Sequence, residues 1–337
     1  MKHVNSMHRV EVVSVVLEPH PNADSLSIVR VYGYNVCVRA RDWTAGGLGA
    51  YIPPDSLVDT TRPEFAFLAR EGRTLERIRA VRLRGTMSQG LLIAAPDGSR
   101  IGDDVADCLG VTHYEPPVPM TMGGENRPPP PGYHPVYDLE SWYRYKHLIV
   151  DREEVSITEK LHGCNARFLW VDGQFFVGSH RNWKQQDKKN LWWQAVEQNP
   201  WVEGWCRAHP GLTVYAEVYG QVQDLKYGHG RGEYSIAVFD VLQAGRWLER
   251  DDSGVYVDDA NAHAYARTAE YNLSLVPEIY RGPYSENKMQ TLINGPSMIP
   301  NANHLREGVV IKPVMERTCP EIGRMALKAV SAEYHAR

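Results

Sequence analysis

The chain has 337 residues, of which 43% are hydrophobic and 23% charged, so it is long enough for two globular domains with sizeable cores. No run of about 18 apolar residues occurs, which excludes a transmembrane helix, and the first residues lack the apolar stretch of a secretory signal. Its net charge of −4 excludes a chain that binds nucleic acid through overall positive charge.

The five cysteines are scattered along the chain, and none of them forms a CxxC pair. An odd number without such a pair argues against a disulfide framework and against a structural zinc site. We therefore expect a cytoplasmic protein, because the cytosol keeps thiols reduced. Nothing in the sequence requires more than a monomer.

Residues 1–113 are interpreted as short β-strands separated by turns. Stretches such as RVEVVSVV and SIVRVYGYNVCVRA are rich in valine and are followed by Gly, Pro and Asp. About five or six such strands predict a small all-β barrel, for which an OB-like fold is the first choice. Only residues 64–72 have the spacing of a helix.

Arginine is concentrated in one part of this barrel. Residues 62–84 hold seven arginines and three glutamates, a net charge of +4, whereas residues 1–114 as a whole are neutral. Such a cluster is suited to binding phosphates. The alternative is a solvated surface with local ion pairs, and the sequence alone does not decide between the two.

Residues 114–135 contain eight prolines, which exclude the interior of a helix or of a central strand. This composition predicts a semi-rigid linker. The linker divides the chain into an OB-like domain, residues 1–113, and a second domain, residues 136–337.

The second domain mixes strands and helices. Stretches such as ARFLWVDGQFFVGS, LTVYAEVYG and GVVIKP predict strands, and residues 189–209 and 259–271 predict helices. Strands that do not alternate regularly with helices indicate an antiparallel α+β domain. The absence of GxGxxG and GxxxxGK[ST] argues against a dinucleotide-binding fold and a P-loop.

Lys160 ends an apolar stretch and is followed by a His-Gly turn, which makes it a candidate nucleophile. A lysine attacks only as the neutral amine, and burial and neighbouring cations favour that form. Lys312 and Lys328 lie on other apolar strands, and we expect them to hold Lys160 uncharged. Taken singly, each is more often a lysine of an edge strand whose ammonium reaches the solvent.

Two carboxylates, Glu217 and Glu307, also lie on apolar strands. A carboxylate in such a place is costly unless it is paired or binds a ligand or a metal. The alternative is an ion pair with Lys312 or Arg181. Phe239, on another predicted strand, is more often a core residue than a platform for a base.

The order of short motifs along residues 156–330 resembles that of the covalent nucleotidyltransferases, which include polynucleotide ligases and mRNA capping enzymes. EKLHGCNARF resembles their nucleotidyl-acceptor motif, Lys-x-(Asp/His/Asn)-Gly, with Lys160 as the acceptor. It is followed, in the family's order, by GSHRN, VYAEVYG, YSIAVFDV, EGVVIKP and MALKAV. The acceptor motif alone arises by chance, whereas the ordered series is specific.

Further features resemble RNA ligases, and in particular those of the Deinococcus type. DNA ligases usually have aspartate where this chain has His162. The stretches YIPPDSLVDTTRPEFAFLA and RLRGTMSQGLL resemble the OB-like domain that precedes the ligase domain in Deinococcus-type enzymes. The resemblance covers nearly the whole chain. It implies an ATP-dependent ligase that joins 5′-phosphate and 3′-hydroxyl RNA ends, with nicked duplexes as the expected substrate.

The resemblance also implies roles for individual residues. Lys160 would take AMP from ATP with the help of Mg²⁺ or Mn²⁺, and Glu307 and Glu217 would hold the metal. The implied catalytic residues are Lys160, Lys312, Lys328 and Glu307. The implied nucleotide-binding residues are Glu159, Lys160, His162, Gly163, Arg167, Arg181, Glu217, Phe239, Lys312 and Lys328.

One departure from the family pattern concerns its last motif. Many RNA ligases have two lysines there, whereas Ala326 and Val330 flank Lys328 in this chain, so Arg324 is a candidate for the missing charge. Three alternatives remain open. The first is a capping-type guanylyltransferase, the second is a DNA ligase, and the third is an RNA-binding relative without catalytic activity.

Overall fold

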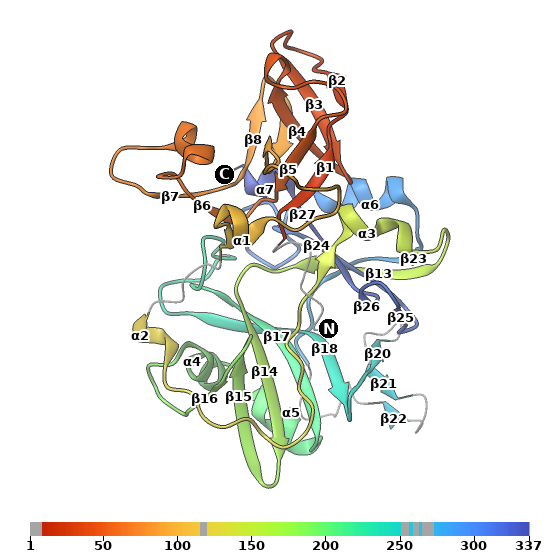
Figure 1. Cartoon of the computed structure of the whole chain (residues 1–337). Coiled ribbons are helices and arrows are strands. Elements are labelled where there is room, and N and C mark those ends of the chain that lie inside the picture. The colour runs from red at the N-terminus through yellow and green to blue at the C-terminus, as the bar shows by residue number, and fades with distance from the viewer. Residues whose placement is uncertain (1–8, 115–119, 251–255, 259–262, 265–272, 337) are drawn as a thin grey trace. The chain divides into compact units, whose positions relative to one another are not determined.

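The structure, a computed structural model, describes residues 9–114, 120–250, 256–258, 263–264 and 273–336. The chain folds into two compact units, each discontinuous in sequence (Figure 1). Unit 1 comprises Met1–Glu115, Glu140–His147 and Ala329–Arg337, and unit 2 comprises Pro116–Leu139 and Leu148–Lys328. In the described residues, no helix is long and apolar enough to cross a membrane.

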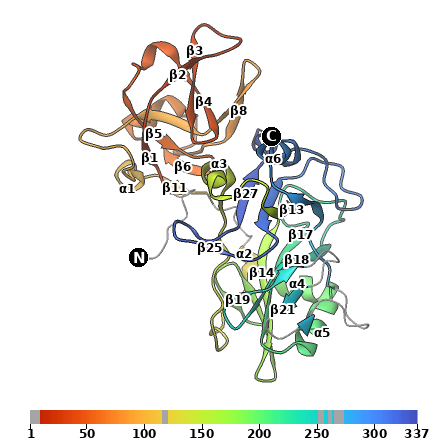
Figure 2. The same ribbon diagram turned by 90° about the vertical axis from the view of Figure 1, so that its right-hand side faces the viewer.

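Unit 1 is built from short antiparallel strands, as the sequence predicts, and Figure 2 shows them curving around a common interior. Their hydrogen-bonded orders are β1-β5-β10, β2-β3-β4, β11-β6-β7 and β8-β9. The strands are β1 (Glu11–Ser14), β2 (Leu17–Pro19), β3 (Leu26–Val31), β4 (Tyr34–Arg39), β5 (Leu48–Ile52), β6 (Ser56–Asp59), β7 (Leu75–Arg77), β8 (Ala80–Leu83), β9 (Thr86–Gln89), β10 (Leu91–Ala94) and β11 (Thr112–His113). A short helix, α1 (Ala106–Leu109), follows β10.

The helix expected over residues 64–72 is shorter and tighter than predicted. The structure has a 3₁₀ helix, η3 (Pro63–Leu68), in its place. A 3₁₀ helix repeats every three residues, which suits Phe65 and Leu68, because Phe65 is fully buried in the barrel core and Leu68 packs against that core.

Residues 140–147 pack with the N-terminal strands although about a hundred residues of chain separate them. They form β12 (Glu140–Ser141) and α3 (Trp142–Tyr145). The hydroxyls of Tyr34 and Ser141 are hydrogen-bonded, and Arg144 Nη2 lies 2.6 Å from Glu11 Oε2. Unit 1 ends with α7 (Ala332–His335). Its contacts therefore join segments from both ends of the chain.

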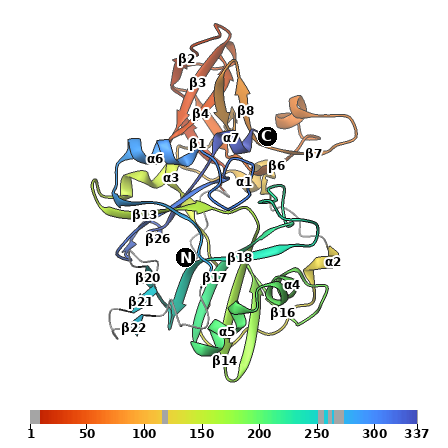
Figure 3. The same ribbon diagram turned by 180° about the vertical axis from the view of Figure 1, so that it is seen from behind.

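Unit 2 contains a six-stranded antiparallel sheet of order β16-β15-β14-β17-β18-β19. Its strands are β14 (Cys164–Val171), β15 (Gln174–Ser179), β16 (Trp183–Lys184), β17 (Leu212–Gly220), β18 (Tyr234–Gln243) and β19 (Arg246–Trp247). Two helices, α4 (Leu191–Gln198) and α5 (Trp201–Ala208), lie beside this sheet in Figure 3. The single helix expected over residues 189–209 is thus broken, because Pro200 cannot continue the hydrogen bonding of α4.

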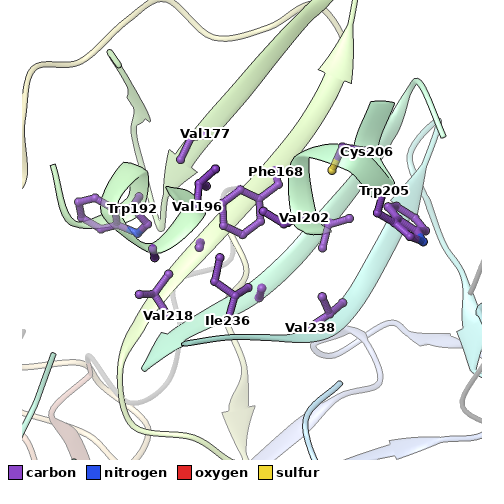
Figure 4. Close-up of a cluster of buried hydrophobic side chains, with 14 of the residues drawn as sticks. Phe168, Val177, Trp192, Val196, Val202, Trp205, Cys206, Val218, Ile236 and Val238 are labelled. Carbon is purple, nitrogen blue, oxygen red and sulfur yellow. The ribbon is translucent and has the colours of Figure 1, made fainter. Parts of the chain in front are cut away.

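The core of unit 2 lies between these helices and one face of the sheet. Figure 4 shows Phe168 of β14 and Ile236 of β18 packed with Trp192, Val202 and Trp205 of the helices. Since side chains alternate between the two faces of a strand, the residues between the core positions project from the opposite face. That opposite face carries most of the candidate site residues of this sheet.

A second sheet of unit 2 has the order β27-β24-β13-β23. It consists of β13 (Glu154–Lys160), β23 (Glu278–Pro283), β24 (Gly308–Pro313) and β27 (Leu327–Val330), and the border between the units falls within β27. The smaller elements are α2 (Met120–Gly123), 3₁₀ helices η2 (Ala40–Asp42) and η4 (Lys146–Leu148), α6 (Glu286–Ile293), β20 (Glu249–Arg250), β21 (Tyr256–Asp258), β22 (His263–Ala264), β25 (Thr318–Cys319) and β26 (Gly323–Arg324). Most of the helix expected over residues 259–271 lies outside the described residues, although residues 263–264 form a strand.

Part of the proline-rich segment, residues 114–135, is hydrogen-bonded to the rest of unit 2. Asn126 forms a β-bridge to Lys184, which extends the edge of the six-stranded sheet at β16. Further along, the carbonyl of His134 accepts from Arg167, and the carbonyl of Pro135 accepts from the Tyr215 hydroxyl. The face of the sheet opposite the helices is therefore covered in part by residues 134–137.

Candidate active site

Lys160 is the last residue of β13, and the turn after it has room only for glycine. A Cβ on Gly163 would lie 2.0 Å from the carbonyl oxygen of Val218 on β17. The backbone of the turn therefore lies directly against the six-stranded sheet, and Gly163 N donates to Glu217 Oε1 at 2.8 Å. The Lys-x-His-Gly sequence thus places the Lys160 amine where the two sheets of unit 2 approach each other.

The Lys160 ammonium is paired with a buried carboxylate. Its Nζ lies 2.7 Å from Glu307 Oε2, and the side chains are 25% and 10% exposed. Burial alone would raise the pKa of Glu307, but Lys160 and His162 lower it to about 2. The sequence predicts cations around this amine, whereas the structure places the Glu307 carboxylate beside it, and an adjacent carboxylate favours the ammonium form.

The imidazole of His162 lies between two carboxylates. Its Nε2 is 2.7 Å from Asp224 Oδ1, and its Nδ1 is 3.6 Å from Glu307 Oε2. Burial alone would lower the pKa of His162, but Glu307 and Asp224 raise it to about 9. The ring is therefore protonated at neutral pH and adds a second cation beside Glu307.

Glu217 differs from Glu307 in its state of ionisation. Burial raises the pKa of Glu217 to about 7, and the nearby charge of Glu307 acts in the same direction. Lys160 and His162 oppose the shift without cancelling it. Two neighbouring carboxylates are thus held in different states, an arrangement often found where chemistry takes place.

Lys312 shares a sheet face with Lys160 but has a different partner. Lys160 pairs with Gly308 and Ser156 with Lys312 in the β13–β24 register, so the two lysines project from the same side of the sheet, about 13 Å apart along the strand. The Lys312 ammonium lies 2.7 Å from Asp240 Oδ1 on β18. This ion pair joins the two sheets of unit 2.

Asp240 is fully buried and binds a second cation, Arg324. The guanidinium nitrogens of Arg324 lie 2.9 Å and 3.0 Å from the two carboxylate oxygens. Burial alone would raise the pKa of Asp240, but Arg324 and Lys312 lower it. Arg324, the candidate for a missing lysine, is therefore already engaged. The Tyr137 hydroxyl completes the group by donating to Asp240.

Phe239 lies at a bulge in β18, and one side of its ring is already in contact with protein. The β17–β18 register shifts between Tyr215 and Ala216, and Phe239 has no partner in it. The Phe239 ring is half-buried, with its centroid 4.7 Å from that of Tyr137. A ring held in this way is suited to stacking on a planar ligand with its remaining surface.

Two predicted residues occupy other surroundings. Glu159 projects from the opposite face of β13 to Lys160, and its carboxylate accepts from Ser297 Oγ and Met298 N, both at 2.6 Å. Arg167 is buried and donates to the carbonyls of Ser179 and His134. These contacts hold loops in place, and they give neither side chain a direct link to Lys160.

The remaining two predicted residues lie on separate elements. Arg181 is exposed in the turn between β15 and β16. Lys328 lies on β27, next to the strand that carries Lys312. The structure therefore gathers Lys160, His162, Gly163, Glu217 and Glu307 into one cluster and connects Lys312 to Phe239 and Asp240 in a second.

Sequence reasoning missed Asp224, Asp240, Tyr137 and Tyr227. Asp240 carried a usable signal, because it is a carboxylate on an apolar strand, as Glu217 is. Asp224 and Tyr227 lie in a polar loop, and Tyr137 lies beside the proline-rich segment, where polar and aromatic residues are ordinary. Only the fold brings these residues to the site.

Within the residues that the structure describes, no group of three or more His, Cys, Asp or Glu side chains is arranged to hold a metal ion. The cluster offers the two carboxylates Glu217 and Glu307. Carboxylate oxygens suit Mg²⁺ and Mn²⁺, which commonly take few protein ligands and complete their shell with water and phosphate. The donor set therefore fits a divalent cation that shares its ligands with a nucleotide.

Solved structures of Naegleria gruberi RNA ligase are similar to this chain over nearly its whole length. The form with pyrophosphate has a TM-score of 0.77 and 23% identity, covering 98% of each chain. A lysine-to-alanine mutant with ATP and Mn has a TM-score of 0.76 and 21% identity, covering 96% of this chain and 97% of that one. A glutamate-to-alanine mutant with AMP and Mn has a TM-score of 0.77 and 21% identity, covering 98% of each. At these identities the similarity shows a common fold.

Two family models match the chain in succession. An OB-fold domain model matches residues 6–95, and an RNA ligase model matches residues 153–330. Among curated protein sequences, none matches significantly. The expected fold class, an OB-like barrel followed by an α+β nucleotidyltransferase domain, is confirmed. Because the RNA ligase model covers more than half of the residues, the chain belongs to the RNA ligase family.

Proposed function

We propose that the chain is an ATP-dependent RNA ligase in which Lys160 accepts AMP. The observation that carries this proposal is the place of Lys160, which ends β13 beside Glu307 and precedes a turn fixed by Gly163 and Glu217. The Naegleria gruberi enzyme, which shares the fold, has been solved with ATP and Mn and with AMP and Mn. ATP is therefore the proposed nucleotide.

In the proposed first step, Lys160 nitrogen attacks the α-phosphorus of ATP. The nitrogen–phosphorus bond forms, the bond to the bridging oxygen breaks, and pyrophosphate leaves. The nitrogen must lose its proton before it attacks. Since Glu307 stabilises the ammonium at 2.7 Å, we infer that nucleotide binding has to weaken this ion pair.

The other proposed contacts position the nucleotide. We assign the adenine to the ring of Phe239, the ribose hydroxyls to Glu217, and the phosphates to Arg181, Lys312 and Lys328. The location of Lys312 on the Lys160 face of β13 and β24 supports its part of the assignment. Phosphoryl transfer depends mainly on such positioning and on neutralisation of charge.

A divalent cation, when bound, supplies positive charge to the phosphates of ATP. We propose Glu307 and Glu217 as the side chains that hold it. Glu307 is ionised at neutral pH, and Glu217 with a pKa of about 7 becomes fully ionised only when a cation or a higher pH favours that form. Mn²⁺ or Mg²⁺ fits such an oxygen donor set.

In the later proposed steps, AMP passes to a 5′-phosphate end, a 3′-hydroxyl attacks that phosphate, and AMP leaves. We propose a nick in a duplex as the substrate. An OB-fold domain that precedes the ligase domain supports assignment to the Deinococcus type, because most ligases carry their extra domain after the ligase domain.

The arginines of residues 62–84 differ in their partners. Arg77 lies 2.6 Å from Asp55, and Arg62 and Arg70 have carboxylate partners as well. Arg82 and Arg84, in the β8–β9 hairpin, are exposed. We propose that these two contact nucleic-acid phosphates. Charged residues on an edge strand can instead serve to prevent strands of different molecules from pairing. A salt titration distinguishes this role from phosphate binding by Arg82 and Arg84.

That test compares Arg82→Ala/Arg84→Ala with Arg39→Ala/Arg41→Ala, which removes two exposed arginines elsewhere in unit 1. Loss of two phosphate contacts should reduce the slope of log affinity against log salt by about two. The control pair should leave the slope unchanged. Equal slopes for both variants and the wild type would mean that the hairpin does not bind the RNA backbone.

The proposed nucleotide chemistry is tested by intact mass. The protein, first treated with pyrophosphate to remove any bound AMP, is incubated with ATP and Mn²⁺. A gain of one AMP by the wild type and none by Lys160→Ala is expected. A gain of GMP from GTP would instead indicate a guanylyltransferase, and no gain from either nucleotide would indicate a non-catalytic relative. Equal sealing of nicks ending in ribose and in deoxyribose would indicate a DNA ligase.

A further inference from the structure

A loop between β17 and β18 encloses the turn that follows Lys160. Tyr227 Oη accepts a hydrogen bond from His162 N at 2.7 Å. Gln223 Nε2 lies 3.9 Å from Cys164 Sγ, and Asp224 Oδ1 lies 2.7 Å from His162 Nε2. Two residues of this loop thus contact His162 of the turn, at its backbone and at its side chain, and a third contacts the first residue of β14.

The loop is fixed by residues other than Asp224. Leu225 and Tyr227 are buried, and the Tyr227 ring packs against Tyr219 and His304 with centroids 5.2 Å and 4.7 Å away. Gly228 lies against Asn301, where a Cβ would be 2.7 Å from the carbonyl oxygen. The loop is therefore anchored by the buried neighbours of Asp224, whose own side chain is 61% exposed.

Asp224 contacts one ring nitrogen of His162. An imidazole can turn about its bond to Cβ, and a hydrogen bond to one nitrogen fixes where the other points. With Nε2 held at Asp224, Nδ1 faces Glu307 at 3.6 Å, and the same Glu307 oxygen binds Lys160 at 2.7 Å. Asp224, His162, Glu307 and Lys160 thus form a continuous series of contacts.

We propose that Asp224 is a positioning residue for the transfer of AMP to Lys160, acting through His162. It does not contact the reacting atoms. Its exposed carboxylate holds the imidazole so that Nδ1 remains beside the Glu307–Lys160 pair. The inference rests on the proposed function, and it assigns a role to a loop that carries none of the recognised motifs.

The experiment measures single-turnover formation of the AMP adduct at several ATP concentrations, stopped with SDS after pyrophosphate treatment of the protein. Asp224→Ala should lower the maximal rate about tenfold, as expected for loss of a hydrogen bond to a charged group. The ATP concentration for half-maximal rate should stay within about twofold, because Asp224 acts on the nucleophile and not on the nucleotide. Asp224→Asn keeps an acceptor oxygen and should lose less.

Two controls separate positioning from a structural effect. Glu203→Gln changes another carboxylate that has an ion-pair partner, Arg207 in α5, and should retain the wild-type rate. The melting temperature of Asp224→Ala should match that of the wild type, since Leu225 and Tyr227 anchor the loop. In a His162→Ala background, adding Asp224→Ala should change the rate by less than about twofold, because residues that act through one another are not additive.

A wild-type rate in Asp224→Ala would overturn the inference, as would the same tenfold loss in both the native and the His162→Ala backgrounds. These results concern Asp224 alone. A wild-type protein that takes up no AMP would instead overturn the proposed function, and the inference with it.

Discussion

The Lys312 ammonium lies 2.7 Å from the carboxylate of Asp240, a side chain that is completely buried. Lys312 belongs to the sheet that carries Lys160, and Asp240 belongs to the sheet that carries Glu217. The two sheets of unit 2 are thus fastened by a buried ion pair beside Phe239. The pair fixes the relation between the two halves of the candidate site.

Asp240→Ala should strongly destabilise the protein. It leaves Lys312 and Arg324 without the carboxylate that both of them bind, and breaking a buried pair in this way typically costs about 3–5 kcal/mol. Chemical denaturation monitored by tryptophan fluorescence measures the loss. Asp172→Asn is the matched control, since Asp172 is exposed in a hairpin and asparagine tolerates its positive φ. A loss below about 1 kcal/mol would mean that the pair does not stabilise the fold.

Gly163→Ala should abolish formation of the AMP adduct. The added methyl would lie 2.0 Å from a backbone oxygen on β17, so the turn must move and carry Lys160 and His162 with it. Intact mass with ATP and Mn²⁺ provides the measurement. Gly123→Ala, where nothing lies within 4 Å of the new Cβ, should behave as the wild type. Full activity of Gly163→Ala would show that the turn adapts easily.

Glu217→Gln should stabilise the metal-free protein at pH 8 but not at pH 5. Burial raises the pKa of Glu217 to about 7, so the unfolded chain loses this proton at lower pH than the folded one. Protonated Glu217 contributes its full stability only below the pKa that this side chain has in the unfolded protein. That contribution is lost as the pH rises through 7, the pKa of Glu217 in the folded protein. The gain at pH 8 should be on the order of 3 kcal/mol. Unfolding in EDTA at both pH values measures it, and an equal effect at both would contradict the shifted pKa.

Glu159→Ala should reduce stability more than it reduces affinity for ATP. Its carboxylate is 1% exposed and holds Ser297 Oγ and Met298 N, so truncation leaves buried donors without an acceptor. The expected cost is about 2 kcal/mol in the free energy of unfolding. Ser297→Ala removes one of the two contacts and should cost less. If Glu159→Ala instead weakens ATP binding and leaves the free energy of unfolding unchanged, Glu159 belongs to the nucleotide site.

Several features of the fold followed from local patterns. Strands β14, β17 and β24 coincide with apolar stretches rich in β-branched and aromatic residues, as predicted. The sequence predicts one helix over residues 189–209, whereas the structure has two, α4 and α5, separated at Pro200. The sequence predicts a helix over residues 64–72, whereas the structure has a 3₁₀ helix that ends at Leu68. Element type was thus more predictable than element boundaries.

Local sequence marked the candidate nucleophile and the charged residues that accompany it on strands. Lysine and glutamate on apolar strands are conspicuous because burying a charge is costly, and that signal marked Lys160, Glu217, Glu307 and Lys312. The partners of these charged side chains follow from the tertiary structure alone. It pairs Lys160 with Glu307 and Lys312 with Asp240. The physical reason is that a pairing between distant strands depends on register and on sheet packing, neither of which a local stretch of sequence encodes.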